Sequence, residues 1–496
     1  MIYNPKINMK LITMNSYFNF ENTYTYLPKC FFTLQDIEEV PSPDLVIFND
    51  KLAKSLDINI PSNDKKELAK IFSGNFNNKN MNTFAQAYAG HQFGHFTNLG
   101  DGRALMLGEH LNKCGKRFDV QMKGSGVTPY SRQGDGKAAL GPMLREYIIS
   151  EAIHYLNIPT TRSLSVIKTG EDVFREKKLK GSILTRIASS HIRVGTFQYA
   201  AAQQDIKILK SLFDYTVDRH YSELKNSNEI FIEVLKEFSL KQINLITHWM
   251  RVGFIHGVMN TDNMTLSGET IDYGPCAFMN SYDPNTKFSS IDHMGRYCYK
   301  NQPIIAQWNI ARFAETLLPL ISSDLDEAIK KAEDVIKSIP ETYKTCWLNM
   351  MRKKLGLVDK DNEDENIINS LLSWMEKNNA DFTNTFIDLM NEENLDQSIY
   401  KSNDFKNWLE IYKKRKLSKN FSKSKSIKLM QENNPVIIPR NHIVENVLSS
   451  ADEGDLKPLN KFLKILENPY DNNLKISNYY KTDIKSGEPY MTFCGT

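Results

Sequence analysis

The chain has 496 residues, of which 41% are hydrophobic and 24% charged, with a formal net charge of +3. This composition is ordinary for a soluble globular protein, and so small a net charge gives no argument for a nucleic-acid or membrane partner. No apolar run approaches the roughly 18 residues that span a bilayer, so we expect a soluble chain.

The cysteines and the first residues of the chain indicate in which cellular compartment the protein is expected. Residues 1–15 contain no apolar stretch long enough for a signal peptide and lack the arginine-rich character of a transit peptide. The six cysteines are far apart without a C-x-x-C pair, which argues against a zinc site and a disulfide scaffold. We therefore expect a cytoplasmic protein.

The first half of the chain alternates glycine-rich and strand-like segments. Short elements and a polar linker at residues 74–82 precede a glycine-dense stretch at 84–131, which contains β-like runs at 103–108 and 118–123. The apolar spacing then predicts a helix over 137–156 and strands over 163–169 and 181–188.

After residue 205 the pattern becomes helical. An apolar-striped helix is predicted over 239–253, followed by a loop at 256–263 and β-like pieces at 264–266 and 270–273. Helical patterns continue over 304–395, and the lysine- and serine-rich segment 413–428 is predicted to be solvated rather than to bind nucleic acid.

This order of elements is that of an α+β, protein-kinase-like two-lobed fold with N- and C-terminal extensions. We expect an N-terminal extension over 1–95, an N-lobe over 96–205, a mainly helical C-lobe over 206–430 and a C-terminal extension over 431–496.

A glycine loop precedes the first β-like run, with the sequence Asn-Leu-Gly-Asp-Gly-Arg at residues 98–103. Gly100 and Gly102 would let backbone N–H groups approach an anion, and Arg103 would add a positive charge. A tight Gly-Asp-Gly hairpin would have the same sequence, so both interpretations stay open here.

A lysine and a glutamate follow in positions typical of a nucleotide site. Lys123 ends the second β-like run, and Glu146 lies in the helix that follows; a strand lysine oriented by a helix glutamate is the kinase arrangement. Taken alone, the pair favours a surface lysine and a surface glutamate. Between them, the loop containing Asp135 and Gly136 can present N–H groups to phosphate, and it can also be a helix-entry turn capped by Asp135. The two interpretations are compatible.

The strongest local pattern is His-Gly-Val-Met-Asn-Thr-Asp-Asn at residues 256–263, followed by Ile-Asp-Tyr-Gly at 271–274. Asn263 and Asp272, placed on adjacent strands, would supply the oxygen ligands that magnesium prefers. Asp262 would remain free to accept a proton from an attacking hydroxyl. Polar residues that only cap turns are the alternative.

Two other pairs are less specific. Arg186 and Arg193 are seven residues apart, a spacing that occurs on any surface. His91 and His95 lack the glutamate and the regular helix of a zinc motif, so we predict structural hydrogen bonds and no metal for them.

Together these motifs resemble the selenoprotein O family of protein adenylyltransferases. The resemblance runs from about residue 22 to the C-terminus. It includes Tyr-Thr-Tyr-Leu-Pro at 24–28, Tyr-Ala-Gly-His-Gln-Phe-Gly-His at 88–95, Gln-Met-Lys-Gly-Ser-Gly at 121–126, Ser-His-Ile-Arg-Val-Gly-Thr-Phe-Gln at 190–198 and Pro-Arg-Asn at 439–441. The glycine loop, the 128–136 loop and the 256–263 loop match as well.

The resemblance implies a kinase-like fold with a reversed nucleotide, whose α-phosphate faces the acceptor. It implies Asp262 as the proton acceptor, Asn263 and Asp272 as ligands of Mg²⁺ or Mn²⁺, and Glu146 as the partner of Lys123. The residues that it implies for ATP binding are Gly100, Gly102, Arg103, Lys123, Asp135, Gly136, Arg186, Arg193 and Asp272.

Cys494 matches a cysteine or selenocysteine that family members carry near the C-terminus. In some relatives it forms a disulfide with a cysteine downstream of the metal-binding aspartate, where this chain has serine in the segment 288–293. Cys276 or Cys298 would have to replace that partner, so we expect a free thiol at Cys494.

The leading hypothesis is transfer of AMP from ATP to Ser, Thr or Tyr hydroxyls of proteins, with self-modification as one option and no nucleic-acid or membrane partner. The alternatives are a conventional protein or small-molecule kinase and a non-catalytic ATP-binding scaffold.

Overall fold

The computed structural model describes residues 17–60, 63–76, 81–391, 395, 397–417, 422–473, 479 and 490–492. Within these residues the chain forms two compact units. Unit 1 comprises Met1–Ala87, Leu99–Met143 and Arg162–Ser189, and unit 2 comprises Tyr88–Asn98, Leu144–Thr161 and Ser190–Thr496. None of the described helices is long and apolar enough to cross a membrane. The four-part division expected from the sequence stays a prediction.

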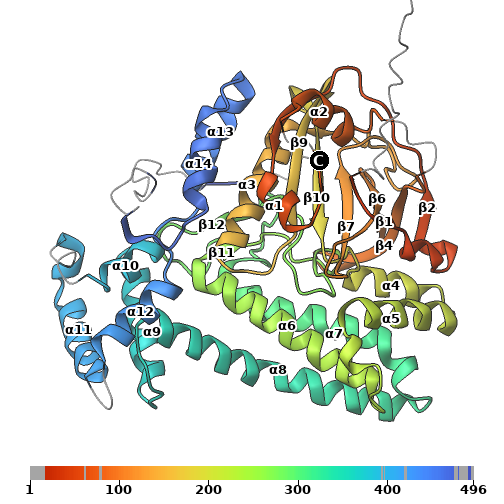
Figure 1. Cartoon of the computed structure of the whole chain (residues 1–496). Coiled ribbons are helices and arrows are strands. Elements are labelled where there is room, and N and C mark those ends of the chain that lie inside the picture. Colours follow the sequence, from red (N-terminus) through yellow and green to blue (C-terminus); the bar gives the residue numbers. More distant parts are fainter. Residues whose placement is uncertain are drawn as a thin grey trace, which may run out of the picture. The chain divides into compact units, whose positions relative to one another are not determined.

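The strands form one large mixed-length antiparallel sheet and one small pair (Figure 1). The large sheet has the order β2-β4-β6-β7-β10-β9-β3, with β1 beside β6, β5 beside β4 and β8 beside β10, and β11 pairs with β12. The strands are β1 (Phe20–Glu21), β2 (Phe32–Leu34), β3 (Asp44–Phe48), β4 (Phe84–Gln92), β5 (His95–Gly100), β6 (Ala104–Leu111), β7 (Arg117–Lys123), β8 (Ala138–Ala139), β9 (Arg162–Phe174), β10 (Lys178–Ala188), β11 (Phe254–Ile255) and β12 (Ala277–Phe278).

Helices make up most of the second half of the chain, as predicted, and others lie in the first half. The described helices of both halves are given together in chain order. They are α1 (Asp50–Ser55), α2 (Lys65–Ser73), α3 (Leu140–Tyr155), α4 (Val194–Ala202), α5 (Ile206–His220), α6 (Ile230–Val252), α7 (Gln302–Ile321), α8 (Leu325–Lys354), α9 (Asp364–Lys377), α10 (Phe382–Asp388), α11 (Asn403–Lys416), α12 (Lys423–Asn433), α13 (Asn441–Glu453) and α14 (Lys457–Leu466). The mixed α and β class is confirmed; the kinase-like topology stays a prediction.

The central strands of unit 1 have one apolar and one polar face. Side chains alternate along a strand, and Val120 and Met122 of β7 belong to a hydrophobic core that also contains Ile183 and Ile187 of β10. Helix α2 contributes Phe72 and its neighbours to the same core. The apolar alternation of these strands therefore fixes which side chains remain for the opposite face.

Unit 2 contains α6, α7 and α8, which pack against one another (Figure 1). The helix α6 carries the apolar stripe expected over 239–253 but begins nine residues earlier, at Ile230. It ends at Gly253, whose φ of 71° is a left-handed conformation that glycine adopts without a steric penalty. This end leads through β11 into the loop at 256–263.

The two β-like pieces predicted after this loop, 264–266 and 270–273, form no regular strand, but each makes one isolated β-bridge, Thr265 with Arg193 and Thr270 with Thr160. Val194 donates to the carbonyl of Met264, and Thr161 donates to that of Thr270. The backbone groups of each piece are therefore satisfied by a distant segment, and Asn263 and Asp272 do not lie on adjacent strands. Asn263 ends the short 3-10 helix η5 (Thr261–Asn263) instead.

Candidate functional site

The polar face of the sheet in unit 1 carries two of the predicted cations. Lys123 ends β7, pairs with Leu184 of β10 and is only 8% exposed. Arg186 pairs with Gln121 two positions along the ladder and is 1% exposed. Since directly paired residues point to the same face, Lys123, Gln121 and Arg186 project opposite the apolar core. The structure thus brings two predicted ATP ligands onto one face.

A buried hydrogen-bond network supports the glycine loop. The carboxylate of Asp101 accepts from the side chain of Gln121 at 3.2 Å and from the backbone N–H of Gln86 at 3.2 Å. Gln121 in turn accepts from Arg186 at 3.5 Å. The residue between the two loop glycines therefore connects the loop to the predicted arginine.

The loop glycines lie close to Tyr130. A Cβ added to Gly100 would come within 2.4 Å of the Tyr130 ring, and one added to Gly102 would lie 3.0 Å from its carbonyl oxygen. The loop joins β5 to β6, and β5 pairs with β4. Arg103 follows the loop, and its carbonyl accepts from the N–H of Gly124, beside Lys123.

Gln86 is a polar residue that the sequence gave no reason to select. It lies on β4, is 2% exposed, and neither its Oε1 nor its Nε2 has a hydrogen-bond partner. An unsatisfied buried amide costs on the order of 1–3 kcal/mol. A ligand on this part of the sheet would satisfy it, and only the three-dimensional structure reveals the missing partner.

Asp135 and Gly136 hold their loop in place. Arg175 donates two hydrogen bonds to the Asp135 carboxylate, at 2.9 and 3.0 Å, and this pairing lowers the pKa of Asp135. Asp135 also accepts from the N–H of Lys137, so it caps a turn that precedes α3, although the helix itself begins only at Leu140. Gly136 has a φ of 65°, and a Cβ there would lie 2.0 Å from the carbonyl oxygen of Gly126.

In unit 2, Asp262 is a buried carboxylate with one unused oxygen. It is 7% exposed; its Oδ2 accepts from Gln92 at 3.5 Å, and its Oδ1 has no hydrogen-bond partner. Burial raises its pKa to about 6, although the nearby Arg193 acts in the opposite direction. A Cβ at Gly90 would lie 2.2 Å from Oδ1, so the backbone of β4 packs directly against this carboxylate.

Arg193 connects the two predicted aspartates. Its Nη1 donates at 2.8 Å to the carbonyl oxygen of Asp262 and at 2.8 Å to Oδ2 of Asp272. The guanidinium lies 4.5 Å from the centroid of the Tyr88 ring and is 3% exposed. Asp272 has a φ of 61°, an uncommon conformation for a non-glycine residue that occurs at functional sites. The arginine with the weakest sequence support therefore lies at the centre of this cluster.

Asn263 presents an amide oxygen suited to a hard cation. Its Nδ2 donates to the carbonyl of Val258 at 2.9 Å, and its Oδ1 accepts from no described residue. No group of three or more His, Cys, Asp or Glu residues able to hold a metal occurs in the described chain. Magnesium needs only one or two protein oxygens when phosphates and water complete its shell, so Asn263 and Asp272 fit this cation without such a group.

Further hydrogen bonds hold the 256–263 loop. Thr261 donates to Gln198 at 2.6 Å and accepts from the N–H of His91 at 2.7 Å. Tyr297 donates to Asn260 at 2.6 Å. These partners are more than 30 residues from the loop. Gln198 ends the 190–198 motif, but neither it nor Tyr297 was assigned a role from the sequence, so sequence reasoning missed both.

The histidine predictions had mixed outcomes. The ring of His91 hydrogen-bonds to Gln198 at 2.7 Å, which confirms its structural role, and burial lowers its pKa. His95 is exposed, and its ring makes no hydrogen bond to a described residue.

Glu146 is 3% exposed on α3 and belongs to unit 2, whereas Lys123 belongs to unit 1. Their pairing stays a prediction. Cys276 and Cys298 are buried, and burial raises the pKa of the Cys298 thiol. Cys494 lies outside the described residues, so its state also stays a prediction.

Comparison with known proteins identifies the family. The profile of the family described as "Protein adenylyltransferase SelO" matches residues 15–467. Proteins named "Protein nucleotidyltransferase YdiU" are 54% identical in Pelagibacter ubique over 96% of this chain and 99% of the relative, and 55% identical in Clostridium perfringens over 97% and 98%. One from Nitrosococcus oceani is 53% identical over 96% of this chain and 97% of the relative. The chain belongs to the protein adenylyltransferase SelO family and is a nucleotidyltransferase.

Proposed function

We propose that this enzyme transfers AMP from ATP to the hydroxyl groups of Ser, Thr or Tyr side chains in proteins, itself included. The observation that carries the proposal is the buried carboxylate of Asp262, whose Oδ1 is unpartnered and whose neighbours are Arg193 and Asp272. Full-length similarity to named nucleotidyltransferases supports the same reaction.

In this reaction the acceptor oxygen forms a bond to the α-phosphorus, and the bond from that phosphorus to the bridging oxygen breaks. Pyrophosphate leaves, and Asp262 accepts the proton of the hydroxyl as a general base. A raised pKa supports this role because it makes the carboxylate a better proton acceptor than an ordinary aspartate.

The remaining residues are proposed to bind the triphosphate. In unit 1 these are Gly100, Gly102, Arg103, Lys123, Asp135, Gly136 and Arg186, and in unit 2 Arg193. Asn263 and Asp272 would hold Mg²⁺ or Mn²⁺, which would neutralise phosphate charge. Positioning and charge neutralisation are the main requirements of transfer at phosphorus, and buried arginines supply both.

We also propose a kinase-like fold with a reversed nucleotide and a cytoplasmic location. The antiparallel sheet that carries Lys123 and the helical segment that leads into the Asp262 loop support the fold. The orientation follows from the family resemblance.

The test uses ATP labelled at either the α- or the γ-phosphorus, with the chain itself and a generic protein as acceptors. We expect label in protein from the α position only. Asp262→Asn should lower the rate by about a hundredfold or more, because general-base catalysis contributes roughly 10²–10⁴. Asp334→Asn, an exposed aspartate of α8, is the matched control.

Transfer of the γ label would instead identify a conventional kinase. ATP binding without any labelled protein would identify a non-catalytic scaffold. An Asp262→Asn variant with the wild-type rate would refute the assignment of the base while leaving the reaction itself intact.

A further inference from the structure

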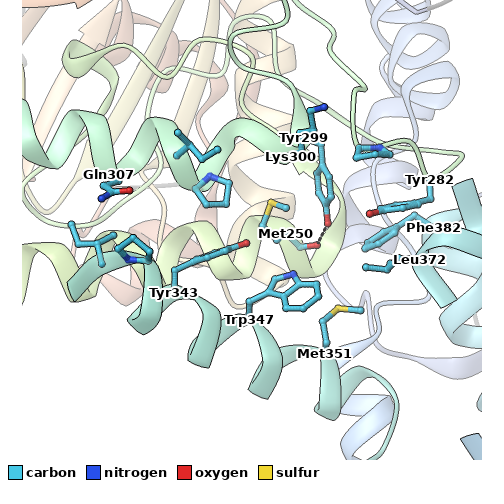
Figure 2. Close-up of a pocket in the computed structure, with 15 residues that line it drawn as sticks. Met250, Tyr282, Tyr299, Lys300, Gln307, Tyr343, Trp347, Met351, Leu372 and Phe382 are labelled. Carbon is cyan, nitrogen blue, oxygen red and sulfur yellow. Dashed lines mark hydrogen bonds between the residues drawn. The ribbon is translucent and has the colours of Figure 1, made fainter. Parts of the chain in front are cut away.

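Unit 2 contains a pocket of about 300 Å³ lined mainly by aromatic, proline and aliphatic side chains (Figure 2). Its walls come from α6, α7, α8, α9 and α10 and from the segment that precedes α7. None of the candidate nucleotide or metal ligands lines it. Small-molecule sites are typically concave, mostly apolar and supplied with a few polar groups, and this pocket has that composition.

Two phenol groups in the pocket have no partner. Tyr282 is only 8% exposed, and neither its hydroxyl nor that of Tyr343 hydrogen-bonds to a described residue. Figure 2 shows both hydroxyls directed inward, toward Met250 and Tyr299. By contrast, the Tyr299 hydroxyl donates to the carbonyl of Met250 at 2.7 Å. Two inward hydroxyls that make no hydrogen bond to a described residue are available to donate to a ligand in the pocket.

Both phenols are protonated at neutral pH. A tyrosine is already protonated there at its ordinary pKa of about 10, and burial raises the pKa of Tyr282 to about 12 and that of Tyr343 further above its ordinary value. Each hydroxyl can therefore donate to an acceptor oxygen of a ligand.

The wall formed by α8 contains a proline. Pro340 lies inside this helix and lacks the N–H that would bond to the carbonyl of Ile336, four residues earlier. The side chain of Gln307 from α7 donates to that carbonyl at 3.2 Å. Since Gln307 and Pro340 both line the pocket, the link between the two helices is part of its wall.

The mouth of the pocket carries a positive charge. Lys300 lines it, is exposed, and has no carboxylate partner among the described residues. Ile304, also at the lining, is 65% exposed. An apolar interior, two inward donors and a cation at the rim are complementary to an aromatic body with a carboxylate.

We propose that this pocket binds a small aromatic carboxylate, separately from ATP and from the acceptor protein. The ring would lie among the aromatic and proline side chains, and the carboxylate would accept from Tyr282 and Tyr343 and face Lys300. The proposal does not depend on the proposed reaction.

The experiment is calorimetric titration of the full chain with indole-3-acetate and with its neutral analogue indole-3-acetamide. We expect saturable binding with preference for the carboxylate. In the double variant Tyr282→Phe and Tyr343→Phe, affinity for indole-3-acetate should fall about tenfold, which corresponds to about 1.4 kcal/mol. Because neither hydroxyl bonds to the protein, this variant should melt at the wild-type temperature.

Charge is tested separately. Lys300→Gln should remove the preference for indole-3-acetate over the acetamide, whereas Lys330→Gln, an exposed lysine of α8 outside the pocket, should keep it. Absence of saturable binding to the wild-type chain overturns the proposal. So does equal affinity in the wild-type chain and the double tyrosine variant.

Discussion

The two oxygens of the Asp262 carboxylate have different surroundings. Oδ2 accepts a long hydrogen bond from Gln92, while Oδ1 is buried against the backbone of Gly90 without a donor. A carboxylate without sufficient donors is costly to ionise, which is why burial dominates its pKa of about 6. The same lack of donors leaves a lone pair for a substrate proton.

This pKa predicts a pH dependence of the transfer reaction. The ionised form of Asp262 is the base, so activity should appear as the pH rises through about 6. Below that value kcat/KM for the acceptor protein should fall about tenfold per pH unit, because this ratio reports the ionisation of the free enzyme. Steady-state rates between pH 4.5 and 8.5 measure it.

The residual activity of Asp262→Asn provides the comparison, since it should show no step near pH 6. If kcat/KM of the wild-type enzyme did not change between pH 5 and pH 8, Asp262 would be excluded as the titrating base. A step that persists in Asp262→Asn would assign the titration to another group.

Several of these residues could be selected from the sequence, and others could not. Asp262, Asn263 and Asp272 stand close together in one motif whose residue types suit a cation and a proton. Gln86 and Arg175 belong to no motif. Gln86 is notable because its buried amide lacks a hydrogen-bond partner, and Arg175 because it contacts Asp135 across 40 residues of sequence. Such properties exist only in the folded chain.

At the scale of elements, one aspartate joins three helices of unit 2. Asp364, at the start of α9, is fully buried and accepts from Arg352 of α8 at 2.6 Å and from Arg415 of α11 at 2.7 Å. Arg415 also donates to the carbonyl of Asp359. Both guanidinium groups are largely buried, and each forms an ion pair with this carboxylate.

We predict that Asp364→Ala lowers the free energy of unfolding by about 3–5 kcal/mol, because two buried cations lose their counter-charge. Urea denaturation followed by circular dichroism measures the change. Asp334→Ala, an exposed aspartate on α8, should change the same quantity by less than about 0.5 kcal/mol. Equal stability of the two variants would show that the arginines find other partners.

The elements with strong periodicity were predictable, and the errors have a common cause. β7 and α6 follow their apolar patterns closely. The helix expected from residue 137 begins at Leu140, because Ala138 and Ala139 pair with Gly181 and Ser182 of β10. The β-like pieces expected over 264–266 and 270–273 likewise pair with distant residues and form no regular strand. Local propensity cannot reveal such partners.

At the scale of the whole molecule, each unit is assembled from separate stretches of chain. Unit 1 takes three segments, and residues 88–98 and 144–161 between them belong to unit 2. The two groups of candidate residues follow the same division, with Lys123 and Arg186 in unit 1 and Asp262 and Asp272 in unit 2.

The polar face of the sheet in unit 1, which carries Lys123 and Arg186, leads to a prediction about the thermal stability of the whole chain. A ligand that binds only the folded state stabilises it by about 2.7 kcal/mol at a hundredfold excess over its Kd. We therefore expect ATP with Mg²⁺ to raise the melting temperature of the wild-type chain. Lys123→Met should lose most of this rise, because a buried ammonium is the point charge proposed for the phosphates.

The readout is the shift that ATP causes in each protein relative to its own melting temperature without nucleotide, measured by scanning calorimetry. Any direct effect of the substitution on stability therefore cancels. Lys116→Met places the same change on an exposed lysine in the turn before β7 and should keep the full shift. If Lys123→Met also kept it, the triphosphate would have to bind away from the polar face of the sheet. The assignment of Arg186, which lies on that face beside Gln121, would then fail with it.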